Sequence, residues 1–504
     1  MDTTPQACPA IDPYAPAHLY FTETEGWLEG AAMDVAHADV EAQLATRGAE
    51  LLRRLFQAHL DRRAERERQA LATAPAPAGM VVRPRTRHLT TVFGRVHVTR
   101  LAWAPRGATG RNAACPLDQA LSLPPEAYSL GLRRTVAEHL RDQAGRGTVA
   151  AVDRATAGHV PARQAWDLAA RAAQDFDAFY AGRAHAANDN AVADALHVMS
   201  CDSKGVRMIP AALRDATRKA RAHAATDGVR GDPTAVRGDR PHDRRMAVVT
   251  ANGDPRPQPR TAAEILRELH RKPRRRPRKA RPQPQHKRVR ATLVQALGPA
   301  VTEMFAEADR RDPAHLRPLV ALVDGADAQR DQIRAEAARR GRTLTLVLDL
   351  LHALHYVWLA AMALCHEHPR TARACVTTYL EKLLTRPILD VIAGLRQSAT
   401  RRGLTGKRRA AVDQCADFLH KNAALVDYPR FLREGLPIAT GVIEGACRHL
   451  VQDRLGITGA QWDLVSAEAI LRLRALHASG DWEAYWHFHL RQEHLRHYPP
   501  PKAA

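Results

Sequence analysis

Three acidic residues at the edges of apolar stretches are the residues in this chain best suited to chemistry. Asp202 directly follows the mainly apolar run 196–201, Asp324 directly follows the apolar run 319–323, and Glu444 stands in the sequence Gly-Val-Ile-Glu-Gly. Two aspartates at strand ends and a glutamate on a later helix can hold a pair of divalent metals against a phosphodiester. Asp324 lies 122 residues after Asp202, and Glu444 a further 120 residues on, so only tertiary folding could unite them.

Each acid also has an ordinary structural explanation. Asp202 and Asp324 follow strand-like runs, and active sites of α/β sheets lie at such carboxyl ends, but an aspartate there is more often a turn or capping residue. Glu444 falls near the start of a helix that Thr440 can cap, where the helix dipole favours a carboxylate. The alternative for Glu444 is a surface ion pair with Arg448, one turn later.

Composition favours a nucleic-acid partner. The chain of 504 residues is too long for one compact core, so we expect two or three domains. Its 75 Lys and Arg residues against 54 Asp and Glu residues give a net charge of +21, which attracts a polyanion in a salt-dependent manner. In a chain this basic, the acids above suggest chemistry on DNA.

Several classes of protein are disfavoured. The seven cysteines contain no Cys-x-x-Cys pair and no zinc-finger spacing, so we expect reduced, mostly buried thiols. The first thirty residues lack the basic start and apolar block of a signal peptide. The longest apolar run, Tyr356 to Cys365, has ten residues and is too short for a bilayer. We therefore expect a cytoplasmic protein.

The elements before the first acid are expected to bind DNA. Residues 1–80 form a mainly helical region, and residues 81–181 contain a β-hairpin with its turn at Gly94-Arg95 and a helix-turn-helix. Pro161 suits the first position of the second helix of that motif. Arg163 and Gln164 would then lie where recognition side chains reach base edges. An αα-hairpin that touches no DNA remains an equal alternative on these residues.

An α/β domain is expected to carry the three acids. Residues 182–191 read as a linker, and in residues 192–504 short apolar runs alternate with helical stretches. Residues 360–435 have a helical pattern and are predicted to be an all-helical insertion. The strand-like runs are Leu196–Cys201, Met246–Val249, Ala291–Leu297, Leu319–Val323 and Leu344–Leu348.

A basic arm is predicted within this domain. Eleven of the twenty residues 271–290 are cationic and none is acidic. A segment so rich in proline and arginine cannot pack, so we expect a disordered loop over about 211–288. Arg274, Arg275 and Arg276 are its candidate phosphate-binding residues, and the alternative is a solvated insertion without DNA contact.

The most specific stretch is C-terminal, Leu436-Pro-Ile-Ala-Thr-Gly-Val-Ile-Glu-Gly-Ala-Cys-Arg-His-Leu450, continued by Trp462 and by Gly480-Asp-Trp-Glu-Ala-Tyr-Trp486. With Cys115-Pro-Leu-Asp118 upstream, it resembles bacterial insertion-sequence transposases of the ISKra type. These are a branch of the Asp-Asp-Glu transposases with a ribonuclease-H-like core. The resemblance covers most of the chain from about residue 85.

The resemblance implies roles for particular residues. Asp202, Asp324 and Glu444 would be the catalytic, metal-binding triad for two Mg²⁺ ions, which Mn²⁺ can replace. Asp349 and His352 look like the element that follows the second acid. Their spacing puts them on one helix face, where they could hydrogen-bond each other in a supporting role, or supply a fourth ligand.

We expect two further side chains to act near this triad. Arg448, one turn after Glu444, would support it. Trp462 could stack on an unpaired base at the cleaved DNA end, with a core tryptophan as the equal alternative.

The sequence as a whole predicts an α/β, ribonuclease-H-like DNA transposase. It would bind terminal inverted repeats of an insertion sequence at the bacterial nucleoid, cleave the DNA and transfer the strand. Joining two ends in one event favours a homodimer or higher oligomer. The alternatives are a catalytically decayed or repurposed DNA-binding protein and a two-metal structure-selective nuclease.

Overall fold

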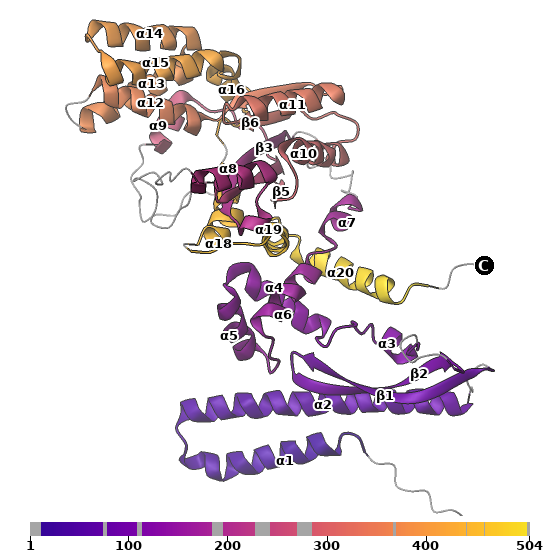
Figure 1. Ribbon diagram of the computed structural model, residues 1–504. Coiled ribbons are helices and arrows are strands. Elements are labelled where there is room, and N and C mark those ends of the chain that lie inside the picture. Colours follow the sequence, from indigo (N-terminus) through magenta and orange to yellow (C-terminus); the bar gives the residue numbers. More distant parts are fainter. Residues whose placement is uncertain are drawn as a thin grey trace, which may run out of the picture. The chain divides into compact units, whose positions relative to one another are not determined.

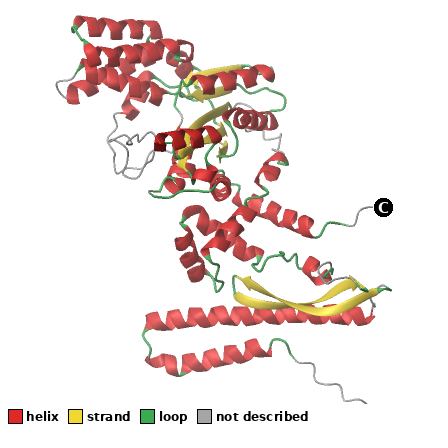
Figure 2. Cartoon of the chain, viewed as in Figure 1, coloured by secondary structure: helices red, strands yellow, loops and turns green. Residues whose placement is uncertain are grey.

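The computed structural model describes residues 12–73, 78–107, 113–183, 195–226, 242–269, 285–365, 369–439, 441–457 and 459–500. The chain forms two compact units, one of residues 1–181 with 482–504 and the other of residues 182–481. Among the described residues helices predominate, and the strands there form a hairpin and one larger sheet (Figure 2). No helix in the described ranges has both the length and the apolarity to cross a bilayer.

The domain limits differ from the expected ones at the C-terminus. Residues 482–504 were assigned to the α/β domain, but they belong to the first unit. The reason is packing. Helix α20 (Trp482–His497) buries Tyr485 and Trp486, and the hydroxyl of Tyr485 donates to the carbonyl of Ala172 at 2.5 Å.

A helical hairpin and a β-hairpin open the first unit (Figure 1). Their elements are α1 (Ala15–Glu29), the 3₁₀ turn η1 (Ala31–Asp34), α2 (His37–Thr73), β1 (Met80–Thr91) and β2 (Gly94–Pro105). Leu60 of α2 packs against Val96 and Val98 of β2. α2 also covers the open edge of β2, because Gln57 accepts the His97 N–H at 2.8 Å and Glu67 accepts the Leu101 N–H at 2.8 Å.

The turn of the β-hairpin lies two residues earlier than predicted. Thr91 pairs with Gly94, so Val92 and Phe93 form the turn, not Gly94-Arg95. The Thr91 hydroxyl accepts the Phe93 N–H at 3.1 Å and donates to the Gly94 carbonyl at 2.9 Å. Gly94 follows the turn at φ 106°, a conformation that favours glycine.

The rest of the first unit is helical. It comprises α3 (Pro116–Ala120), α4 (Leu130–Asp142), α5 (Gly145–Ala155), α6 (Ala162–Ala172), α7 (Phe176–Ala181) and α20. The second helix of the predicted helix-turn-helix is α6, which ends at Ala172, and α7 follows as a separate helix. Val136, Val152 and Leu168 form a common core of α4, α5 and α6.

The second unit is built on a mixed five-stranded sheet in the order β5-β4-β3-β6-β7. β3 is parallel to β6 and β6 to β7, whereas β4 is antiparallel to both β3 and β5. The strands are β3 (His197–Arg207), β4 (Arg244–Asp254), β5 (Gln285–Thr292), β6 (Leu319–Val323) and β7 (Leu344–Leu348). The fold class is therefore α/β, and β6 and β7 match their predicted limits.

Two predictions for the region 211–297 need correction. β5 was expected at Ala291–Leu297 but begins at Gln285, and Leu297 instead starts a helix. The expected disordered loop contains α8, β4 and α9, in which β4 is mostly buried. Arg274, Arg275 and Arg276 lie outside the described residues. The helices that lie between β3 and β7 in the sequence are η4 (Pro210–Ala212), α8 (Asp215–Thr226), α9 (Ala262–Leu269), α10 (Leu297–Arg311) and α11 (Asp327–Arg339).

A helical layer follows β7, as predicted for residues 360–435. It consists of α12 (Leu350–Leu364), α13 (Pro369–Thr385), α14 (Ile388–Arg401), α15 (Gly406–Lys421), η5 (Ala423–Leu425) and α16 (Tyr428–Arg433), with α12 to α15 stacked side by side (Figure 1). Tyr356 of α12 stacks on Phe418 of α15 with ring centroids 3.9 Å apart. Phe418 also lies against Gly325, so this layer supports the turn that carries Asp324.

The last elements of the second unit form an irregular helical segment. They are α17 (Gly441–Ala446), the π-helical turn η6 (Cys447–Gln452), α18 (Asp453–Leu455) and α19 (Leu464–Ala478). π-Helical turns are rare in proteins, and those that do occur are often found at functional sites. This turn directly follows the helix that carries Glu444.

Candidate metal-binding site

Asp202 lies in the middle of β3, and Asp324 directly follows the neighbouring parallel strand β6. Ser200 of β3 pairs with Leu322 of β6, so Asp202 and Asp324 each lie two residues beyond the same registered pair. Adjacent strands are about 4.8 Å apart. The two aspartates are therefore level with each other where β6 ends. Asp324 follows its strand as predicted, but Asp202 was expected to end a strand of residues 196–201 and instead lies inside β3, which continues to Arg207.

Local hydrogen bonds fix both aspartates. Asp202 Oδ1 accepts the Ser203 N–H at 2.6 Å, and Asp324 Oδ1 accepts the Ala326 N–H at 2.8 Å. The Gln329 side chain joins the end of β6 to the middle of β3. Its Oε1 accepts the Asp324 N–H at 3.1 Å and its Nε2 donates to the Cys201 carbonyl. Gln329 is thus a supporting residue that the sequence did not single out.

A third acid lies in the same row. Val323 of β6 pairs with Leu348 of β7, so Asp349 is level with Asp324. Asp349 is buried, and it is the N-cap of α12, with Oδ1 accepting the Leu351 N–H at 2.7 Å. It was expected to share a helix face with His352. It instead precedes the helix, and His352 lies exposed in the first turn.

Glu444 reaches the site from a helix. It is exposed in the first turn of α17, and its carboxylate has no hydrogen bond or ion pair with any described residue. One turn later, the Cys447 thiol donates to Asp202 Oδ2 at 3.2 Å, which ties this helical segment to β3. The signal for Cys447 was its i, i+3 spacing from Glu444.

One cavity of about 450 Å³ unites these residues. Its walls include all three predicted triad residues and the three predicted supporting residues. The lining consists of Cys201, Asp202, Lys204, Leu322, Val323, Asp324, Asp349, Leu351, His352, His355, Ile443, Glu444, Cys447, Arg448 and Gln452.

Acidic side chains outnumber lysine and arginine in the lining of this cavity, although the chain as a whole is basic. No described cation forms an ion pair with Asp202, Asp324 or Glu444. Burial raises the pKa of the Cys201 thiol to about 12, and the charge of Asp324 adds to this rise. Burial and then the Asp202 carboxylate raise the pKa of Cys447 well above its usual range. Both thiols therefore stay protonated beside the acids.

Arg448 does not neutralise Glu444. Its Nε lies 3.6 Å from Asp453 Oδ1, so the alternative of a surface ion pair with Glu444 is wrong. Arg448 nevertheless lines the cavity. Lys204 lines it as well, on β3 two residues after Asp202. The cavity lining thus includes two basic residues besides the acids.

The donor set fits hard divalent cations. Mg²⁺ and Mn²⁺ prefer carboxylate oxygen, and Mg²⁺ commonly takes only one or two carboxylates per ion. The three triad acids do not have ligand atoms all within 4.8 Å of one another, which a single ion shared by all three would favour. A pair of ions would not require all three carboxylates to reach one position.

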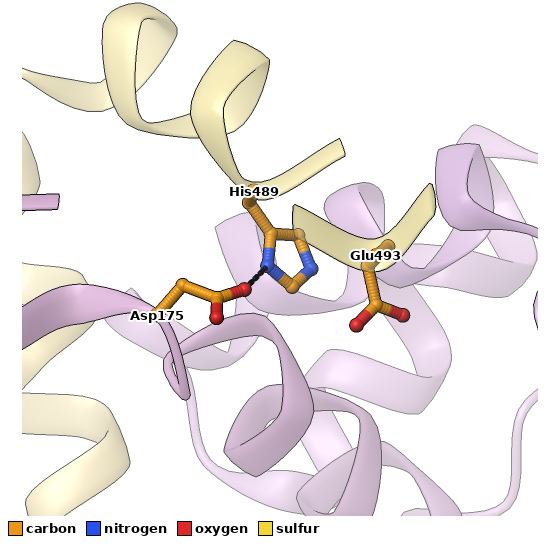
Figure 3. A group of neighbouring side chains, drawn as sticks. All are labelled: Asp175, His489 and Glu493. Atoms are coloured by element: carbon orange, nitrogen blue, oxygen red, sulfur yellow. Dashed lines mark hydrogen bonds and ion pairs between the residues drawn. The ribbon is translucent and has the colours of Figure 1, made fainter. Parts of the chain in front are cut away.

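A tighter cluster lies in the first unit. Asp175, His489 and Glu493 are the one group of three in the described ranges with ligand atoms all within 4.8 Å of one another (Figure 3). His489 Nδ1 lies 2.7 Å from Asp175 Oδ2. Arg133 lies 2.6 Å from Glu493 and 3.1 Å from His489, and Arg496 lies 2.5 Å from Asp175. Guanidinium groups already supply the positive charge, so this cluster is an ion-pair network that anchors α20.

The predicted DNA-binding residues have mixed outcomes. Arg163 and Gln164 are exposed in the first turn of α6, as a recognition role requires. Trp462 is 6 % exposed, its backbone bridges to Met208, and Arg454 lies 4.8 Å above its ring. The core alternative therefore describes Trp462, and its ring offers no free face to a base.

Comparisons with known proteins add no family assignment. A scan against protein-family models and a search of curated proteins gave no match to this sequence.

Proposed function

We propose that this chain is an Asp-Asp-Glu DNA transposase with a ribonuclease-H-like core, which binds the terminal inverted repeats of an insertion sequence and catalyses strand cleavage and strand transfer. One observation carries the proposal: a single cavity gathers Asp202, Asp324 and Glu444, and no described cation pairs with any of them. An acid cluster left uncompensated in a chain of net charge +21 is costly unless it receives cations from solution.

Each residue has a part that its position supports. Asp202 and Asp324, each fixed by a backbone N–H group, would supply carboxylate oxygens as metal ligands. Glu444 supplies the third carboxylate from α17. Two Mg²⁺ ions about 4 Å apart would activate the attacking hydroxyl and stabilise the leaving oxygen.

Cationic residues would contact the nucleic acid. Lys204 can offer its ammonium group to an oxygen of the scissile phosphate, since it lines the same cavity. Arg163 and Gln164 can approach the duplex from the exposed start of α6. Two DNA ends joined in one event call for at least two copies of the site, so a homodimer is part of the proposal.

The test uses the full-length chain with duplex DNA carrying the sequences that flank its gene. Asp202→Asn, Asp324→Asn and Glu444→Gln should each reduce Mg²⁺-dependent cleavage on the order of 10²–10³-fold. Asp331→Asn is the matched control, because Asp331 is exposed on α11 and lies outside the cavity. Undiminished cleavage in any triad variant would remove that residue from the site.

The products separate the alternatives. Cleavage together with joined strands supports a transposase. Cleavage without any joined product would favour the structure-selective nuclease, and DNA binding without cleavage would favour a decayed or repurposed DNA-binding protein. Replacement of Mg²⁺ by Mn²⁺ should preserve cleavage and Ca²⁺ should not, because Ca²⁺ prefers longer bonds and more ligands.

A further inference from the structure

β7 has an open side, away from the cavity that holds the acids. β7 is the last strand of the described sheet and pairs only with β6 there. The Asp349 N–H donates to Val323 of β6, whereas the Leu348 carbonyl accepts the Tyr428 hydroxyl at 3.1 Å. Backbone groups alternate in direction along a strand, so Leu344 and Leu346 face the same side as Leu348.

On this side of β7, the backbone N–H and C=O groups of Leu344 and Leu346 form no hydrogen bond with the backbone of any described residue. An open strand edge of this kind is a template for pairing with another chain. The side chains of both residues are only half-buried, although they pack against the buried hydrophobic core of this unit.

A groove of about 480 Å³ runs along this edge. Its walls are formed by α11, by η5 and by α16, and they contain three arginines and no acidic residue. The lining consists of Arg334, Ala337, Ala338, Arg342, Leu344, Thr345, Leu346, Ala424, Leu425 and Arg430.

The three arginines differ in availability. Arg342 pairs with Asp309 at 2.8 Å, and Arg430 pairs with Asp427 at 3.0 Å. Arg334 is exposed on α11 and has no ion pair or hydrogen bond with a described residue. Arg334 is therefore the cation most open to a new partner.

We propose that this groove binds an extended, acidic peptide segment of a partner protein, which pairs with β7 as an added strand. The main chain of the peptide would exchange hydrogen bonds with Leu344 and Leu346, and its carboxylates would meet Arg334. The two open residues span about 7 Å, so a segment of three to five residues suffices.

A peptide fits this edge better than DNA. The Leu344 and Leu346 carbonyls need hydrogen-bond donors, which a phosphodiester lacks, whereas a peptide main chain offers both donors and acceptors. Arginine recognises a carboxylate as readily as a phosphate, so charge alone does not decide between them. The proposal is independent of the proposed catalytic function, since the groove and the acidic cavity share no residue.

The experiment measures binding of a fluorescent pentapeptide of alternating glutamate and valine to the full-length protein. A second peptide carries N-methyl groups on its valines, which removes the pairing N–H groups and keeps the charge. The unmethylated peptide should bind at least about tenfold more tightly. Arg334→Glu should weaken binding of the unmethylated peptide by a similar factor.

Arg401→Glu is the matched control. Arg401 is exposed on α14, does not line the groove and should leave binding unchanged. Hydrogen exchange gives a second measurement. The Leu344 and Leu346 amides should exchange quickly in the free protein and become protected when the peptide is added.

Three outcomes would overturn the proposal. Equal binding of both peptides would show that no strand is added. Protection of Leu344 and Leu346 in the free protein would show that the chain covers its own edge. Protection by duplex DNA but not by the peptide would assign the groove to the nucleic acid.

Discussion

Asp202 and Asp324 lie at the same level on two adjacent parallel strands, although 122 residues separate them in the sequence. The β3–β6 register has the same offset, because Ser200 pairs with Leu322. The offset of the β6–β7 register likewise equals the separation of Asp324 and Asp349. A row of three acids, with Asp202 within β3 and with Asp324 and Asp349 directly after β6 and β7, thus follows from strand registration.

Asp349 can be tested as a metal ligand separately from its role as a helix cap. Asp349→Asn keeps a good N-cap but loses the charge, so the stability of the second unit should change little. If Asp349 contributes to the metal site, this variant should need several-fold more Mg²⁺ for half-maximal cleavage. Asp349→Ala should also cost about 1 kcal/mol in urea denaturation. An unchanged Mg²⁺ dependence in Asp349→Asn would leave the residue with capping alone.

The helix of Glu444 offers a test of whether flexibility serves activity. An added Cβ at Gly445 would meet only His449 Cδ2, at 4.0 Å, so Gly445→Ala should stabilise the fold by about 0.5–1 kcal/mol. Gly456→Ala is the matched contrast, because its Cβ would lie 2.7 Å from the Gln452 carbonyl oxygen and should destabilise. Thermal unfolding measures both. A more stable Gly445→Ala protein with lower cleavage would indicate that α17 must move during the reaction.

Trp462 should act through folding rather than through DNA. It links the end of β3 to the segment after α18, since the Ile209 N–H donates to its carbonyl at 2.9 Å and its own N–H donates to Arg207 at 3.1 Å. Trp462→Ala should cost about 3–5 kcal/mol and Trp462→Phe less. Affinity for single-stranded DNA, measured per folded molecule, should stay the same in Trp462→Phe. A large loss of affinity in a fully folded variant would restore the stacking role.

The sequence predicted well those strands whose burial is purely apolar. The limits of β6 and β7 were correct because β6 is a continuous apolar run and β7 contains a single polar residue, Thr345. β5 was misplaced because it contains Arg288 and Arg290, both buried, and Arg288 is compensated by Glu307 on α10. Such compensation depends on a distant partner, which local pattern does not reveal.

In the candidate site, too, local sequence identified individual residues but not the contacts between residues far apart in the chain. Asp202, Asp324 and Glu444 were identified from their local contexts, and the fold brings them into one cavity. The bond from Cys447 to Asp202 was not foreseen, because it joins residues 245 positions apart. The ion-pair network of His489 was missed for the same reason, since its partner Asp175 lies 314 positions away.

Acid stability should depend on Asp254, at the end of β4. Burial alone would raise the pKa of this carboxyl, but the hydrogen bond to His197 and the charges of Arg311 and Arg317 outweigh burial and lower the pKa to about 2. A carboxyl with a depressed pKa stabilises the fold above its unfolded pKa near 3.8, and this contribution is lost as pH falls through the folded value. The shift corresponds to about 2 kcal/mol.

Asp254→Asn removes this contribution and so provides the measurement. The wild-type protein should be the more stable at pH 7, and its advantage in free energy of unfolding should shrink by up to about 2 kcal/mol between about pH 4 and pH 2. Urea denaturation at a series of pH values measures it. Asp331→Asn serves as the control, because Asp331 is exposed and should show no comparable loss. A constant difference between wild type and Asp254→Asn over that window would mean that His197 and the arginines do not depress the pKa of Asp254.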